Sequence, residues 1–266
     1  MDTTEIIRDH YNAGVEAEWG RIDNRPEFIL TCRFLSRYIK PGDSVLDIGG
    51  GPGRYSLWLA EKGCDVTLLD LSPENVKFAA AKAREKNLSI RALEGNALTA
   101  DSSVTGTFDH VLLMGPLYHL LTEGEREQAV HAALRLIKPG GLLCVSFINV
   151  FAGMIYAMKF VPEIISDRNE DEFYRAVLSD TSFAGQAFTQ AFFINQNEVL
   201  PFMSRFPLEK LHLFGQEGIT SPCEGNIMSQ PKEIVDAWMD MAEKLAEREY
   251  LLSWAEHLMY IGRKKQ

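Results

Sequence analysis

The sequence predicts an α/β fold, a doubly wound, seven-stranded, mostly parallel sheet whose last strand is antiparallel. Two observations lead to this prediction. Short apolar runs alternate with helical segments through residues 43–149, and a glycine-rich turn joins the first apolar run to a helix. We expect an N-terminal helical lid over 1–40, a core over 41–149 and 195–266, and a cap insertion over 150–194.

The first expected strand, 45–48, delivers an acid and alternating glycines into a helix over 54–62. Its apolar character is typical of a strand buried on both faces. Glycine permits positive φ and lets a ligand approach the backbone closely. This segment therefore predicts a nucleotide cradle, and its candidate cofactor-binding residues are Asp47, Gly49, Gly51 and Gly53.

Asp47 lies two residues before the first glycine. This position distinguishes between two kinds of ligand that the turn could bind. Dinucleotide folds read G-x-G-x-x-G and place a pyrophosphate on the helix N-terminus. A carboxylate there would repel a pyrophosphate but can accept a hydrogen bond from an ammonium group or a water. The pattern resembles the first motif of class I S-adenosylmethionine (SAM)-dependent methyltransferases. The resemblance implies SAM as cofactor, S-adenosylhomocysteine (SAH) as product, and methyl transfer as the activity.

The second expected strand, 65–70, ends in Asp70, which we predict grips both ribose hydroxyls, with Leu71 beside it. The alternative is an acid that only caps the helix beginning at Ser72 and Pro73.

A third strand, 89–93, leads to Asn96, where methyltransferases of this class commonly have an acid. Its amide oxygen can accept from the adenine amino group, and the backbone N–H of Ala97 can donate to a ring nitrogen. A fourth strand, 108–114, ends in Met114. The resemblance places Met114, Tyr118 and His119 beside the methyl donor and the acceptor.

The remaining core follows the same family order. A capping box at Thr122 and Glu125 starts a helix, and the Lys-Pro-Gly-Gly run at 138–141 stops it before a fifth strand. Two final strands are expected over 208–215 and 257–264. The resemblance covers 43–149 closely and these last strands more loosely, so ligands belong at the carboxyl ends of the parallel strands.

Composition limits the partners. The chain has 266 residues and a formal net charge of -10, which disfavours a surface that tracks nucleic-acid phosphates. The four cysteines lie far apart without a C-x-x-C motif, so we expect reduced thiols, a cytoplasmic location and no metal site. No targeting or membrane segment is evident. We expect a monomer or homodimer acting on a small molecule.

The segments outside the core carry the candidates for acceptor binding. Tyr11 is a lid residue or a packing tyrosine, and Arg21 binds an acceptor carboxylate or pairs with Glu18 or Glu27. The aromatic set of the cap, including Tyr156, lines an apolar pocket or forms a satellite core. A second set at helical spacing is expected to pack in the core: Ile234, Trp238, Met241 and Leu245.

Methyl transfer requires alignment of an acceptor lone pair with the S–CH3 bond and exclusion of water. An N or O acceptor must also lose a proton, and C is a further candidate. We predict His119 as the base, His257 as the second choice and Tyr118 as a positioning group; a structural His119 is the alternative. Glu217 and His257 should both face the acceptor. Two rival functions remain, an NAD-dependent oxidoreductase and a non-catalytic SAM-binding regulatory protein.

Overall fold

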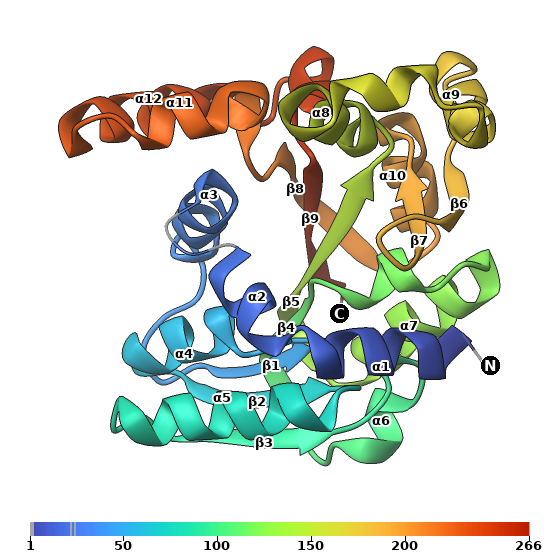
Figure 1. The fold of residues 1–266 in the computed structure, drawn as a ribbon. Helices are drawn as coiled ribbons and strands as arrows, with labels where there is room; N and C mark the ends of the chain where they lie inside the picture. Colours follow the sequence, from blue (N-terminus) through green and yellow to red (C-terminus); the bar gives the residue numbers. More distant parts are fainter. Residues whose placement is uncertain (1–2, 22, 24, 266) are drawn as a thin grey trace.

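A twisted mixed sheet forms the centre of the computed structural model, which describes residues 3–21, 23 and 25–265 (Figure 1). Its parallel strands follow the order β3-β2-β1-β4-β5. The order reverses between β1 and β4, which is where open α/β sheets bind ligands. The five strands are β1 (Ser44–Ile48), β2 (Asp65–Asp70), β3 (Ile90–Glu94), β4 (Phe108–Leu113) and β5 (Ile137–Asn149).

Helices connect these strands as the sequence predicts, confirming the α/β class. The capping box is present, because the Thr122 side chain accepts from the backbone of Glu125 and the Glu125 side chain accepts from the backbone of Thr122. The Lys-Pro-Gly-Gly run does not lie before the fifth strand as expected, since β5 already begins at Ile137. The connecting helices are α4 (Arg54–Glu61), α5 (Pro73–Glu85), the short α6 (Ala100–Ser103) and α7 (Glu123–Arg135).

The two final strands have the predicted limits, β8 (Leu208–Gly215) and β9 (His257–Lys264). Both run antiparallel to their neighbours, and β9 pairs with β5. The first residue of β9, His257, lies opposite Ile148 near the carboxyl end of β5. The sheet therefore brings His257 to the edge where the parallel strands end.

The cap adds two strands that the sequence analysis did not predict. A hairpin of β6 (Phe183–Gln186) and β7 (Gln190–Ile194) joins the sheet, because β7 pairs in parallel with the end of β5. Within the described residues the sheet thus has nine strands, where seven were expected. The hairpin follows α8 (Phe151–Phe160), two 3-10 turns (Pro162–Ser166 and Arg168–Glu170) and α9 (Asp171–Leu178), and it precedes α10 (Gln196–Met203).

The cap aromatics form a satellite core, which was one of the two alternatives. Phe173 and Phe193 are buried and pack with Phe183 and Tyr174. Tyr156, predicted to bind substrate, is instead 53% exposed on α8, with its ring tilted by 51° against that of Phe160. The prediction for Tyr156 is wrong because the inner face of α8 is formed by smaller residues such as Ala152.

The C-terminal insertion contains η5 (Gly218–Cys223), α11 (Glu224–Met228), α12 (Lys232–Leu245) and η6 (Glu249–Trp254). The prediction that the Ile234, Trp238 and Met241 stripe packs in the core is wrong, since these side chains are 42–47% exposed. The neighbouring stripe is buried instead: Val235, Met239 and Ala242. The helix α12 is therefore rotated about its axis relative to the prediction. Close packing explains this, because a β-carbon on Gly218 would lie 3.2 Å from Cβ of Ala242.

The N-terminal region is helical as predicted, with α1 (Thr3–Ala13), α2 (Val15–Arg21) and α3 (Pro26–Leu35). The first two helices lie across the carboxyl-end side of the sheet, near α5 (Figure 1). No helix in the described part of the chain combines the length and the apolar character needed to cross a bilayer.

Candidate cofactor and acceptor site

A cavity opens over the carboxyl ends of β1, β2 and β4, and most of the predicted cofactor residues line it. Gly53 lies outside, as the N-cap of α4. Residues from α1 and α2 complete the wall. The role of the N-terminal region as a lid stays a prediction. The predicted residues that line the cavity are Tyr11, Arg21, Asp47, Gly49, Gly51, Asp70, Leu71, Asn96, Ala97, Met114, Tyr118 and His119.

The glycine turn has the backbone conformation that the sequence predicted, with positive φ at Gly49, Gly51 and Gly53. A β-carbon on Gly49 would lie 2.5 Å from Cδ and Cγ of Pro116. At Gly51, φ is +55° and no protein atom lies within 4 Å of an added β-carbon. Gly49 is therefore required by protein packing, whereas Gly51 leaves open space for a ligand.

Asp47 is the next-to-last residue of β1 and is 1% exposed. Its Oδ2 accepts a hydrogen bond from Oγ of Ser56 at 2.7 Å. Burial raises the pKa of Asp47 to about 6, despite the opposing effect of the Ser56 hydrogen bond. A β-carbon on Gly50 would lie 2.7 Å from Asp47 Oδ2, so the glycine also makes room for this carboxyl.

Asp70 closes β2 and holds the glycine turn against this strand. Its Oδ2 accepts from the backbone N of Gly51 at 2.8 Å. Its Oδ1 accepts from the backbone N of Ser72 at 2.9 Å and from Nδ2 of Asn75 at 3.1 Å. Burial raises the pKa of Asp70, although these three hydrogen bonds oppose the shift. A carboxylate has about four acceptor positions, so one on Oδ2 is left for a ribose hydroxyl.

Asn75 was missed by the sequence analysis. It lines the cavity, and its Oδ1 is a buried acceptor without a partner among the described residues. A buried polar group without a hydrogen bond costs free energy, so a ligand donor at this position would be stabilising. The sequence did contain a signal for Asn75. It is a polar residue in the first turn after the Ser72 and Pro73 cap, and such a residue faces the end of the preceding strand.

Asn96 has a different local role from the one predicted. Its side-chain Oδ1 caps the 3-10 turn Ala97–Thr99 by accepting from the backbone N of Leu98 at 2.9 Å. The amide oxygen keeps one acceptor position beyond this bond. Adenine recognition through Asn96, with this oxygen accepting from the adenine amino group, therefore stays a prediction.

A tyrosine–histidine pair connects the lid to the site. Nδ1 of His119 lies 3.2 Å from the carbonyl O of Gln190, to which it donates, so Nε2 accepts from the hydroxyl of Tyr11 at 2.7 Å. Burial lowers the pKa of His119 to about 4, and the Gln190 bond opposes this shift. His119 is therefore neutral near pH 7, with both ring nitrogens engaged. As a base it would require Tyr11 to relay the proton or move away.

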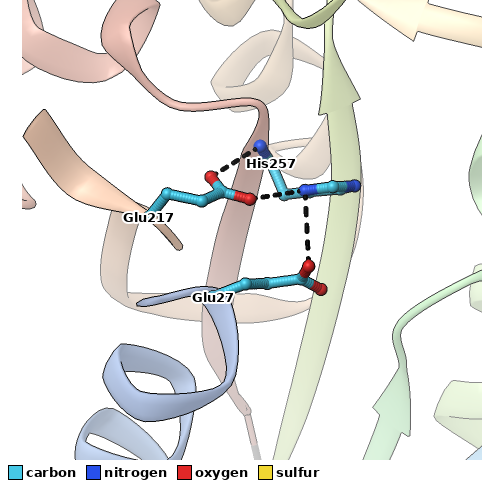
Figure 2. Close-up of side chains that lie close together, drawn as sticks. All are labelled: Glu27, Glu217 and His257. Atoms are coloured by element: carbon cyan, nitrogen blue, oxygen red, sulfur yellow. Dashed lines mark hydrogen bonds and ion pairs between the residues drawn. The ribbon is translucent and has the colours of Figure 1, made fainter. Parts of the chain in front are cut away.

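The second histidine lies in a cluster of charged side chains (Figure 2). Nδ1 of His257 donates to Oε1 of Glu217 at 2.6 Å and lies 3.8 Å from Oε2 of Glu27. Burial lowers the pKa of His257, but Glu27 and Glu217 outweigh it and raise the value to about 9. His257 is thus protonated near neutral pH, which corrects the prediction that it is a base. Neither His257 nor Glu217 is among the residues lining the cavity.

Arg21 pairs with both predicted glutamates, as one alternative anticipated. Its Nε donates to Oε1 of Glu18 and its Nη1 donates to Oε2 of Glu27, both at 2.9 Å. Glu27, Glu217 and His257 each offer a ligand atom within 4.8 Å of the others. Arg21 and the protonated imidazole already neutralise these two carboxylates, so we assign no metal here.

The fold and the cavity define a Rossmann-like domain that binds a nucleoside-containing cofactor, because a glycine turn and a strand-ending acid meet at the reversal of strand order. A family model described as a methyltransferase domain matches residues 45–141. A ubiquinone biosynthesis O-methyltransferase of Caulobacter sp. (strain K31) is 33% identical over 61% of this chain and 72% of the relative. The chain belongs to the class I SAM-dependent methyltransferases.

Other relatives match over shorter lengths. A ubiquinone biosynthesis O-methyltransferase of Caulobacter vibrioides is 33% identical over 46% of this chain and 50% of the relative. The chain thus spans about half the length of several curated relatives that it matches.

Solved structures agree on the fold. Magnesium protoporphyrin IX methyltransferase from Synechocystis PCC 6803, with bound SAH, has a TM-score of 0.58 and 15% identity over 99% of this chain and 100% of that chain. An N-methyltransferase from Bradyrhizobium japonicum WM9 in complex with SAH has a TM-score of 0.55 and 15% identity, over 97% and 100% of the two chains.

Loss of the Tyr11 hydroxyl should weaken cofactor binding. In Tyr11→Phe the lid loses its hydrogen bond to His119, a loss of about 1 kcal/mol, so we expect the Kd for SAH to rise roughly 5-fold by calorimetry. Tyr38→Phe is a matched control, because the Tyr38 hydroxyl makes the same kind of bond to Nε2 of His212, at 2.6 Å and outside the cavity. Equal SAH affinities in the two variants would show that the Tyr11 bond does not close the site.

The protonation of His257 should appear in the pH dependence of stability. Its pKa rises from 6.5 to about 9 on folding, so the folded state holds the proton more tightly. The resulting stabilisation is complete below pH 6.5 and is lost as the pH rises through 9. We expect the free energy of unfolding, measured by urea titration, to fall less over this range in Glu217→Gln than in the wild type. If the free energy of unfolding falls equally with pH in the two proteins, Glu217 does not hold a proton on His257.

Proposed function

We propose that this protein transfers a methyl group from SAM to a nucleophilic N or O atom of a small molecule by in-line displacement, with C as a further candidate. The observation that supports this most is the pairing of an open glycine turn with unused acceptors on Asp70 and Asn75. When bound, SAM supplies an activated methyl group on a sulfonium.

The residues present fit this cofactor. The remaining acceptor position of Asp70 and Oδ1 of Asn75 suit two hydroxyl donors of a ribose. The carboxyl of Asp47 suits an ammonium group or a positioning water. Leu71, Ala97 and Met114 add apolar wall beside these polar groups. Tyr11 and His119 keep the lid closed, which would exclude water during transfer.

Oxygen is the acceptor atom we favour within this proposal. Two relatives that match over 182 and 190 residues are named O-methyltransferases. Proton removal by His119 stays part of the proposal, with the Tyr11 hydroxyl between the ring and the cavity.

The proposal includes a small-molecule acceptor and no nucleic acid, in keeping with the formal net charge of -10. The four cysteines are free thiols, in keeping with a cytoplasmic location. A monomeric or homodimeric state remains a prediction.

Calorimetric titration with SAH and with NAD tests the function. We expect SAH to bind and NAD to give no heat, because the buried carboxyl of Asp47 lies beside the glycine turn where a pyrophosphate would lie. A screen of phenols and amines with methyl-labelled SAM then tests catalysis. Binding of NAD alone would favour an oxidoreductase. SAH binding without transfer to any acceptor would favour a regulatory protein.

A further inference from the structure

We propose, on the basis of the methyl-transfer function above, that Nε2 of His257 binds an oxygen atom of the methyl acceptor. His257 would then be a specificity-determining residue for phenol- or carboxylate-type acceptors. This assigns it a role as a hydrogen-bond donor that positions the acceptor, in place of the role of a base.

The orientation of the His257 ring supports this role. Both oxygens of Glu217 bind His257, Oε1 through Nδ1 at 2.6 Å and Oε2 through the backbone N at 3.0 Å. The imidazole is thus fixed at one edge by a buried carboxylate. Figure 2 shows Nε2 at the opposite end of the ring, pointing away from both glutamates, and no hydrogen bond to it occurs among the described residues.

The location of His257 fits acceptor binding. Its ring centroid lies 6.4 Å from that of Tyr118, and Tyr118 lines the cavity beside Met114 and Gly115 at the end of β4. Glu27, whose Oε2 lies 3.8 Å from Nδ1 of His257, also lines the cavity. His257 is not itself a cavity-lining residue, but its side chain is 15% exposed, so a ligand that reaches past Tyr118 would meet it. The pairing of β9 with β5 places His257 opposite Ile148, near the carboxyl end of β5.

The N–H groups of His257 and Arg21 that are not used by the glutamates indicate which kind of ligand would bind. Glu217 is fully engaged by His257, and Glu27 accepts from Arg21. Beyond these bonds, the cationic groups keep free N–H donors on Nε2 of His257 and on Nη1 and Nη2 of Arg21. At Nε2 of His257 an ammonium group would meet an N–H donor of like charge, whereas an oxygen atom there would accept a charge-assisted hydrogen bond. This favours an oxygen-bearing acceptor over an amine.

Two asparagine substitutions test the proposal. His257→Asn keeps an N–H near the position of Nδ1 and removes Nε2. His212→Asn is the matched control, because Nδ1 of His212 also lies 2.8 Å from a glutamate, Glu247, outside the cavity. The probes are catechol, 4-hydroxybenzoate and benzylamine, each titrated calorimetrically into the SAH-loaded protein.

We expect at least one oxygen probe to bind the wild type, about 10-fold weaker binding to His257→Asn, unchanged binding to His212→Asn, and no benzylamine binding. His257→Gln, which restores an N–H near Nε2, should recover part of the affinity. A thermal shift with SAH confirms that each variant is folded.

Three results would overturn the proposal: no oxygen probe binding to the SAH-loaded wild type, equal binding to His257→Asn, or loss of wild-type binding in EDTA, which would indicate a metal. Failure of SAH itself to bind would instead refute the methyltransferase function. The two failures are therefore distinguishable.

Discussion

Asp70→Ala is expected to reduce the affinity for SAH by about 100-fold, since two charge-assisted hydrogen bonds of about 1.5 kcal/mol each would be lost or misplaced. One is the contact to the ribose. The other is the bond that fixes the Gly51 backbone, at 2.8 Å. Isothermal titration with SAH measures the effect directly.

A matched control separates this loss from general destabilisation. Asp109 also accepts several hydrogen bonds, from the backbone N and Oγ of Ser44 and from Nζ of Lys138, but at the opposite end of the sheet. We expect Asp109→Ala to lower the free energy of unfolding by about 2 kcal/mol and to leave the SAH affinity within 2-fold of the wild type. If both variants bind SAH equally, Asp70 is only a capping acid.

Gly51→Ala is expected to have the second largest effect on binding. The added methyl group meets no protein atom within 4 Å, and Gly51 lines the cavity, so the methyl would occupy space needed by the ligand. Such a clash costs about 2 kcal/mol, or roughly 30-fold in the Kd for SAH.

The backbone strain of this variant needs its own control. Gly106 also has positive φ, +92°, and open space around an added β-carbon, but it lies outside the cavity. Gly51→Ala and Gly106→Ala should each lose about 1 kcal/mol of stability from the left-handed conformation. Only Gly51→Ala should lose SAH affinity. Equal affinities would show that the turn is a structural feature without a ligand.

The local signals in the sequence were sufficient for the core of the fold. The capping box at Thr122, the Ser72 and Pro73 cap, and the limits of β8 and β9 were all predicted correctly. Each depends on residues close in sequence, such as a cap and its hydrogen-bonding partner three positions later. The positive φ of Gly49 and Gly51 follows in the same way from the turn itself.

The sequence was less informative where packing partners decide the outcome. The exposed stripe of α12 and the buried one differ by a rotation of the helix, and only the close approach of Gly218 to Ala242 selects between them. The β6 and β7 hairpin was missed because the cap aromatics do not show strand alternation clearly. The prediction for Tyr156 was wrong because its exposure depends on which segments pack against α8.

The sequence predicted the positions of the site residues better than their chemical roles. The sequence placed His119 and His257 near strand ends, but their protonation depends on partners distant in sequence. Tyr11 and Gln190 enclose His119, whereas Glu27 and Glu217 hold a proton on His257. One histidine is therefore neutral and the other cationic, a difference that residue type alone does not carry.

A crystal structure of the protein with SAH would show where the cofactor binds. We expect SAH density over the turn at Gly49 to Gly53, with a ribose hydroxyl within hydrogen-bond distance of Asp70 Oδ2 and of Asn75 Oδ1. Density for SAH elsewhere, or an empty cavity at concentrations far above the calorimetric Kd, would contradict this expectation.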